Sequence, residues 1–244
     1  MVSAHRGGGV RLVRRAAPLL ALLLVACTHP DTVRTLPPDR GAAVVYVALG
    51  DSTVEGVGAS SRTLNYVSLL HERLRAVYPG ARVANLGVGG ATSADVLRRQ
   101  LDRAIEQRPN LITLSIGPND ITTRVPVEVY EKNLATILSR VRHETAAVVV
   151  VNSIPDLAVT PRFRRSRSRE TVGRLTVVFN EAVARQARAH GAELVDLYTT
   201  SRHEVPLRPE LIGRDGYHPS DAGYSRWAEL VWSGIQSRIA AQRQ

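Results

Sequence analysis

Cysteine and aromatic residues are scarce in this chain of 244 residues. Its one cysteine, Cys27, excludes a disulfide within the chain. With aromatic residues at 5%, the core must consist mainly of Val, Leu, Ile and Ala. Hydrophobic residues make up 44% and charged residues 22%, which are ordinary values for a globular protein. The length is enough for one well-buried domain, or at most two small ones.

Lysine is nearly absent, because arginine supplies all but one of the basic residues; the exception is Lys132. The formal net charge is +10, from 32 basic and 22 acidic residues. The sequence has no zinc-ligand cluster, no RNA-binding signature and no stripe of interleaved basic and aromatic residues, so we predict no nucleic-acid binding. A basic surface can still attract anionic lipid or polysaccharide.

The apolar run near the N-terminus is too short to cross a bilayer, since residues 16–26 form a run of eleven. It follows a segment with several arginines and no acid, and the two features together are typical of a secretion signal. The run ends in Leu-Val-Ala before Cys27, which resembles the lipobox of bacterial lipoproteins. That resemblance implies lipidation of Cys27 as the first residue of the mature protein. The alternative is an ordinary cleaved signal in which Cys27 is incidental.

These patterns divide the chain into a signal peptide (1–26), a tether (27–40) that contains three prolines, and a folded domain (41–244). The protein is expected to be exported and lipid-anchored to the bacterial cell envelope through Cys27, or otherwise secreted. We expect it to act as a monomer.

From residue 41 onward, strand-like apolar runs alternate with segments of helical periodicity. Strands are predicted at 42–49, 82–86, 111–116, 146–154 and 193–198, and helices at 64–77, 93–107, 126–143, 171–190 and 219–241. Such alternation predicts an α/β fold with a doubly wound, flavodoxin-like sheet of five parallel strands, covered by helices on both faces in three layers. Functional groups of such sheets gather beyond the carboxyl ends of the strands.

Four polar segments follow strands or precede the last helix. They are Gly50-Asp51-Ser52-Thr53, Asn85 to Gly90, Gly117-Pro118-Asn119-Asp120, and Asp215-Gly216-Tyr217-His218. Acyl transfer by a serine needs a base, a group that orients the base, and donors for the oxyanion.

These segments supply each of those groups. Ser52 lies on a strand-to-helix turn that can expose its hydroxyl, and His218 is the candidate base. Asp215, three residues before His218, can reach the Nδ1 proton within one turn. The candidate oxyanion donors are the backbone N–H groups of Ser52 and Gly90 and the side-chain amide of Asn119.

The four segments, in this order, resemble the conserved blocks of the SGNH, or GDSL, hydrolase superfamily over roughly residues 44–232. The resemblance implies a serine esterase with a Ser52-His218-Asp215 triad and an oxyanion hole of Ser52, Gly90 and Asn119, without metal or cofactor. Gly90 is assigned by its register with the Asn that opens the second block. Two positions depart from the family pattern. Thr53 replaces the usual Leu, in a position that supports the turn, and Pro118 replaces a small residue.

Simpler roles compete at each position. Ser52 could be a helix N-cap, His218 could cap the last helix, and Asp51 more plausibly anchors the turn than takes part in chemistry. Asp120 could cap the loop that presents Asn119. Asp196, at the end of the fifth strand, is the rival triad acid.

The sequence leaves the substrate open. An acyl ester of a lipid or small molecule is the main expectation, with deacetylation or acyl transfer on cell-envelope carbohydrate, or a non-catalytic envelope-binding lipoprotein, as alternatives. Residues 162–169 carry five arginines. They are either a solvated loop or a lid or rim that attracts an anionic substrate.

Overall fold

The computed structural model describes residues 1–4 and 33–241 of the chain. Contacts separate residues 1–32 from a compact unit that begins at Val33. The predicted signal peptide beyond residue 4, and Cys27 with its predicted lipid, lie outside the described residues. No helix of the described part of the chain is long and apolar enough to cross a membrane.

A five-stranded parallel sheet forms the centre of the compact unit. Its strands are β1 Val45–Gly50, β2 Arg82–Asn85, β3 Leu111–Ser115, β4 Val148–Asn152 and β5 Glu193–Val195, in the order β2-β1-β3-β4-β5. The order reverses between β1 and β3, and the crevice beyond the carboxyl ends of strands at such a point is where ligands bind in open α/β sheets. The predicted fold class is confirmed.

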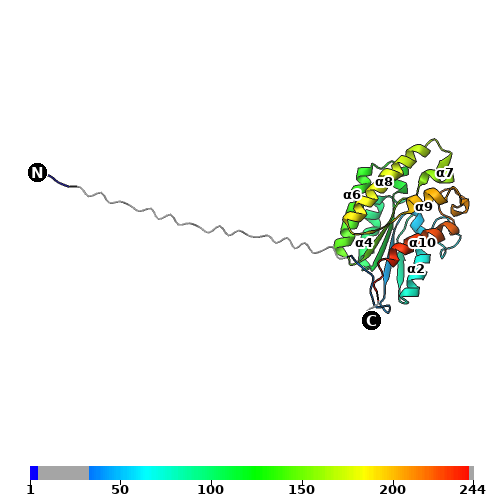
Figure 1. The fold of residues 1–244 in the computed structure, drawn as a ribbon, viewed down its shortest axis with the longest axis horizontal. Coiled ribbons are helices and arrows are strands. Elements are labelled where there is room, and N and C mark those ends of the chain that lie inside the picture. The colour runs from blue at the N-terminus through cyan, green and yellow to red at the C-terminus, as the bar shows by residue number, and fades with distance from the viewer. Residues whose placement is uncertain (5–32, 242–244) are drawn as a thin grey trace. The chain divides into compact units, whose positions relative to one another are not determined.

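Helices cover both faces of the sheet (Figure 1). The helices are α1 Ser52–Glu55, α2 Tyr66–Val77, α3 Ser93–Asp95, the π-helix η1 Val96–Gln100, α4 Leu101–Glu106, α5 Pro118–Thr122, α6 Val127–Glu144, the short 3-10 turn η2 Leu157–Val159, α7 Pro161–Arg164, α8 Arg169–Ala189, α9 Leu197–Glu204, the 3-10 turn η3 Pro209–Leu211, and α10 Asp221–Gln236. One core cluster packs α4, α6 and α8 against the sheet, and a second packs α2 and α10 against the other face. Burial of this apolar surface on two faces is the main stabilising contribution to the fold.

The first eight residues of the compact unit are not the free tether that the prolines suggested. Leu36 is 1% exposed and forms a β-bridge with Ile239. The Arg34 guanidinium donates to the carbonyl of Ala147, and that of Arg40 donates to the carbonyl of Ala240. The compact unit therefore begins at residue 33, eight residues before the predicted start of the folded domain, because an apolar side chain and two arginines hold this segment against it.

Candidate active site

Gly50 ends β1 in a conformation that sets up the turn carrying Ser52. Its φ is +149°, and a Cβ there would lie 2.0 Å from the carbonyl oxygen of Ser115. Asp51 then caps α1, since its Oδ1 accepts from the Thr53 N–H (2.9 Å) and from the Thr53 hydroxyl (2.8 Å). The cap is thus Asp51 and not Ser52, and Thr53 supports the turn as predicted. Ser52, as the first residue of α1, keeps its hydroxyl available for another partner.

That partner is His218. Its Nε2 lies 2.9 Å from Ser52 Oγ, and its Nδ1 lies 2.5 Å from Asp215 Oδ2. A carboxylate oxygen only accepts, so Nδ1 carries the proton and Nε2 accepts from the Ser52 hydroxyl. Asp215 Oδ1 also accepts from the backbone N–H groups of Tyr217 and His218 (2.9 and 3.0 Å). Partial burial alone would raise the pKa of Asp215, but the hydrogen bonds from His218 and these N–H groups outweigh it, so its pKa lies below the ordinary value.

The second and third segments lie beside this relay. Gly90 has a φ of +78°, and its missing side chain would point into open space. The Asn119 amide donates to the carbonyl of Ala91 at 2.9 Å, which places it next to Gly90. The Glu55 carboxylate accepts from the Gly89 N–H at 2.6 Å and so ties this loop to α1.

Other polar residues near these segments have structural roles. Asp196 accepts from the Thr199 N–H at 2.9 Å and caps α9, so the carboxylate paired with His218 is Asp215. Asp120, which is completely buried, accepts from the N–H and hydroxyl of Ser93, so it joins α5 to α3. The cap of α10 is Ser220, not His218.

Gln100 is a contact of this site that the sequence did not reveal. Its side chain is 1% exposed; Oε1 accepts from the Gly50 N–H at 2.9 Å, and Nε2 donates to the Gly50 carbonyl at 2.8 Å. The amide thus holds both backbone groups of the residue before Asp51. No local signal marks it, because Gln100 lies at the end of a π-helix within a segment that reads as an ordinary helix.

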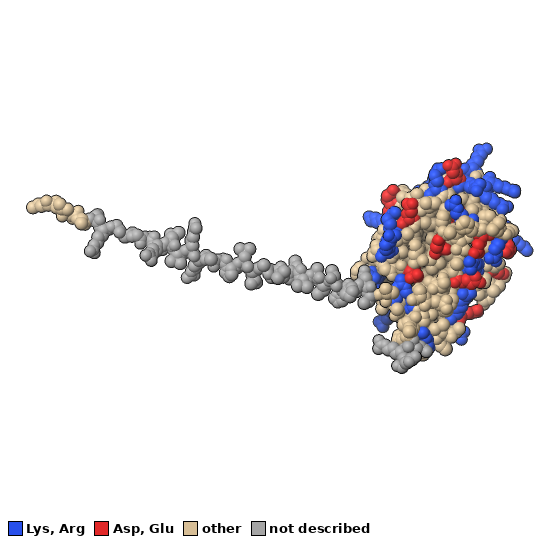
Figure 2. Space-filling view, viewed as in Figure 1, with Lys and Arg blue, Asp and Glu red and all other residues tan. Residues whose placement is uncertain are grey.

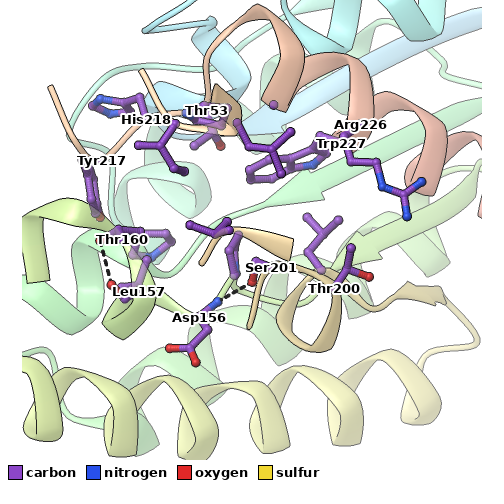
Figure 3. A pocket seen from close by; sticks show the side chains of 18 of the residues that line it. Thr53, Asp156, Leu157, Thr160, Thr200, Ser201, Tyr217, His218, Arg226 and Trp227 are labelled. Carbon is purple, nitrogen blue, oxygen red and sulfur yellow. Dashed lines mark hydrogen bonds between the residues drawn. The ribbon is translucent and has the colours of Figure 1, made fainter. Parts of the chain in front are cut away.

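An apolar pocket opens beside Ser52 and His218 (Figure 3). It encloses about 820 Å³ of empty space, counting that at its mouth. In Figure 3, Tyr217 and His218 stand at one end, and Trp227 and Arg226 stand toward the other. The apolar wall comes from Leu157, Leu197, Val205, Leu211, Ile212, Trp227 and Leu230. The Arg226 guanidinium is paired with Glu204 at 2.7 Å, so the charged residues at the far end neutralise one another.

Nothing in the described residues forms a metal site, since no group of three or more His, Cys, Asp or Glu side chains there could hold an ion. The site instead holds a serine hydroxyl hydrogen-bonded to a histidine, which is in turn hydrogen-bonded to a carboxylate. An amide and a glycine N–H lie on the adjacent turn. Such a set of groups can carry out nucleophilic catalysis by serine.

Known proteins share this arrangement of elements. Residues 48–226 match the GDSL-like Lipase/Acylhydrolase family. Esterase TesA of Pseudomonas aeruginosa is 27% identical over 216 residues, covering 88% of this chain and 98% of that protein. An acetylxylan esterase of Geobacillus stearothermophilus is 24% identical over 208 residues, covering 78% of this chain and 91% of that esterase.

A crystal structure of TesA superposes with a TM-score of 0.66 at 25% identity, covering 80% of this chain and 99% of TesA. With the family match extending over well more than half of the sequence, the chain belongs to the GDSL-like lipase/acylhydrolase family and is a hydrolase that acts on ester bonds.

Proposed function

We propose that this protein is a serine esterase in which Ser52 is the nucleophile, His218 the general base and acid, and Asp215 the carboxylate that orients His218. The observation that carries the proposal is the continuous relay from Ser52 Oγ to His218 Nε2 (2.9 Å) and from His218 Nδ1 to Asp215. An isolated serine hydroxyl is a weak nucleophile, and an adjacent base held in the right tautomer is what activates it.

The reaction proceeds in two steps, acylation of Ser52 and hydrolysis of the acyl-serine. Ser52 Oγ attacks the ester carbonyl carbon while His218 Nε2 takes the hydroxyl proton, and that proton then passes to the departing alkoxide, which leaves as the alcohol. Water next attacks the acyl-serine and gives its proton to His218, which returns it to Ser52 Oγ as the acid is released. The Asp215 carboxylate stabilises the imidazolium in both steps.

The oxyanion hole is assigned to the N–H groups of Ser52 and Gly90 and the amide of Asn119. Within the described part of the chain, neither of these two N–H groups donates to another residue. Asn119 uses one amide proton on the Ala91 carbonyl, which leaves the second proton for a substrate oxygen. Three donors aimed at one oxygen stabilise the charge that develops there.

The pocket favours an ester with an apolar substituent. Its apolar wall adjoins Ser52 and His218, whereas Gly90 and Asn119 do not line it. When the ester carbonyl oxygen points at those two donors, the pocket remains free to hold an apolar chain of the substrate. Each buried methylene contributes about 0.8 kcal/mol, which is about fourfold in kcat/KM.

A second candidate is removal of acetyl groups from carbohydrate, which the likeness to an acetylxylan esterase favours. Transfer of the acyl group to an alcohol other than water uses the same relay. Comparing acetyl, butyryl, octanoyl and palmitoyl esters separates the candidates. Activity that rises with the apolar chain supports the pocket assignment, and a preference for acetyl groups supports the carbohydrate reaction.

We also propose that the protein is exported and lipid-anchored through Cys27. The support is the sequence pattern alone: several arginines, an apolar run and a small residue before Cys27. Incorporation of labelled fatty acid into the wild type but not into Cys27→Ser would agree with the anchor, and equal labelling would contradict it.

The relay is tested by kcat on a short p-nitrophenyl ester. Ser52→Ala and Asp215→Asn should each lower kcat by several orders of magnitude. Asp196→Asn is the matched control: it removes the rival carboxylate, but the Asn side-chain oxygen still accepts from the Thr199 N–H and caps α9, so stability and kcat should both change little. Ester hydrolysis by Ser52→Ala at the wild-type rate would refute the mechanism.

A further inference from the structure

We propose that Arg162 and the arginines that follow it form a cationic rim at the mouth of the active site, which selects esters that carry an anionic group. This inference rests on the proposed function, since it concerns the substrate of the same relay. The arginine rim is defined as Arg162, Arg164, Arg165, Arg167 and Arg169.

Aromatic contacts connect the Arg162 side chain to the catalytic histidine. Its guanidinium lies 5.0 Å from the centre of the Tyr217 ring, and the Tyr217 and His218 ring centres are 5.0 Å apart, edge to face. Phe163, which follows Arg162 in α7, packs against Tyr217, with ring centres 5.9 Å apart. A guanidinium stacked on a ring is held in place, so the charge stays beside His218 while remaining exposed to solvent.

A backbone contact fixes Arg162 to the loop that carries Asp215 and His218. The Arg162 N–H donates to the Gly216 carbonyl at 2.9 Å. Gly216 has a φ of +71°, and a Cβ there would meet Pro161 at 3.1 Å. Because Gly216 lies between Asp215 and His218, the start of α7 is held at a fixed place beside the relay.

The charges of the rim are not neutralised by acids. Within residues 33–241, no ion pair or side-chain hydrogen bond involves the guanidinium of any of the five arginines. At the other end of the pocket, by contrast, Arg226 is paired with Glu204 and Glu229. Arginine side chains gather over the end of the molecule that carries α7 (Figures 1 and 2). The unbalanced positive charge thus lies on the His218 side of the mouth.

A substrate anion is the group this arrangement fits. A neutral alcohol gains nothing from a cluster of cations, whereas a sulfonate, phosphate or carboxylate on the part of the ester outside the pocket lies within reach of Arg162. One such charge at about 8 Å is worth roughly tenfold in kcat/KM in a partly exposed site. The substrate class is therefore an ester with an apolar chain for the pocket and an anionic group for the rim.

The test compares two soluble esters of butyric acid, one of phenol and one of phenol with a para-sulfonate. The readout is the ratio of kcat/KM for the sulfonated ester to that for the neutral one. Arg162→Gln should lower this ratio about tenfold, and Arg162→Lys, which keeps the charge, should preserve most of it. Arg75→Gln is the matched control, since it removes the same charge from an exposed position in the last turn of α2, just before the start of β2.

Salt supplies a second measurement. Raising NaCl from 0.02 to 0.5 M should lower the ratio for the wild type toward that of Arg162→Gln, because the Debye length falls below the separation of the charges. An unchanged ratio in Arg162→Gln, or equal losses on both esters, would overturn the proposal. So would an Arg162-dependent acceleration of the neutral ester by anionic vesicles with no effect on the soluble pair, since the rim would then bind a lipid surface. Hydrolysis of both esters that persists in Ser52→Ala would instead refute the relay itself.

Discussion

Among single residues, Asp51 and Ser52 show how burial separates two neighbouring polar side chains. Asp51 is 1% exposed, and only its Oδ1 is hydrogen-bonded, to Thr53; Oδ2 has no partner among the described residues. Burial raises the pKa of Asp51 to about 6, more than the hydrogen bonds from Thr53 lower it. Ser52, one position along, faces His218 instead. The turn therefore contains an acid that is costly to ionise.

This carboxyl makes stability depend on pH. Its pKa is higher in the folded chain, about 6, than the ordinary 3.8, so folding takes up a proton between these values. Its contribution is complete below pH 3.8 and is lost as the pH rises through 6. Asp51→Asn keeps an acceptor for Thr53 but does not ionise. From pH 4 to pH 7, the free energy of unfolding of the wild type should therefore fall by about 2 kcal/mol relative to Asp51→Asn.

Urea unfolding of both proteins at several pH values measures this difference. The Asp215 carboxyl has a lowered pKa and acts in the opposite sense, because its contribution is lost as the pH falls; it is the same in both proteins and cancels. Parallel stability curves for wild type and Asp51→Asn would contradict the assignment.

Among the elements, the π-helix η1 has a specific consequence for Ser52, the proposed nucleophile. It ends at Gln100, whose amide holds the N–H and the carbonyl of Gly50. Gly50 precedes the turn with Asp51 and Ser52, so the position of Ser52 Oγ depends on an element that lies 50 residues away in the sequence. Gln100 is a positioning residue, since it contacts the backbone and not the substrate.

Gln100→Leu should therefore affect both stability and rate. It leaves the buried Gly50 N–H without a partner, while the Gly50 carbonyl keeps the Val88 N–H at 3.2 Å, so the cost is about 2 kcal/mol. It should also lower kcat about tenfold or more with little change in KM, because displacement of a nucleophile by about 1 Å slows the chemical step. Gln107→Leu, at the exposed end of α4, is the control. A loss of stability with unchanged kcat per folded molecule would show that Gln100 has no positioning role.

The elements also show what the sequence could predict. Strand β3 and helix α6 were predicted to within one residue at each end, because a continuous apolar run and a long helical period are local signals. Helix α9 was not predicted, because Leu197 and Tyr198 continue the apolar pattern of β5. In the structure β5 ends at Val195, and the hydrogen bond from the Thr199 N–H to the Asp196 side chain starts α9 instead. Ser52, Asp215 and His218 could be found because each lies in a short motif. Gln100 could not, because its role depends on a long-range contact.

Across the whole molecule, the sheet separates two ends with different tasks. Ser52 and the turn at Asn119 follow the carboxyl ends of β1 and β3. Arg34 binds the carbonyl of Ala147, just ahead of the start of β4, and Leu36 pairs with Ile239. The first and last parts of the described unit are thus joined at the amino edge of the sheet. A tether was predicted there because prolines signal an extended segment, but burial of Leu36 is not visible in such a pattern.

This position of the N-terminal segment decides how the enzyme would face when it is attached to a surface. The described chain enters the fold at the amino edge of the sheet, beside Ala147 and Ile239, and this edge lies opposite the one that carries Ser52. When the compact unit alone is coupled to a solid support directly through Val33, the mouth of the pocket therefore lies away from the support. Immobilised molecules would receive their esters from the surrounding liquid, not from the layer to which they are fixed.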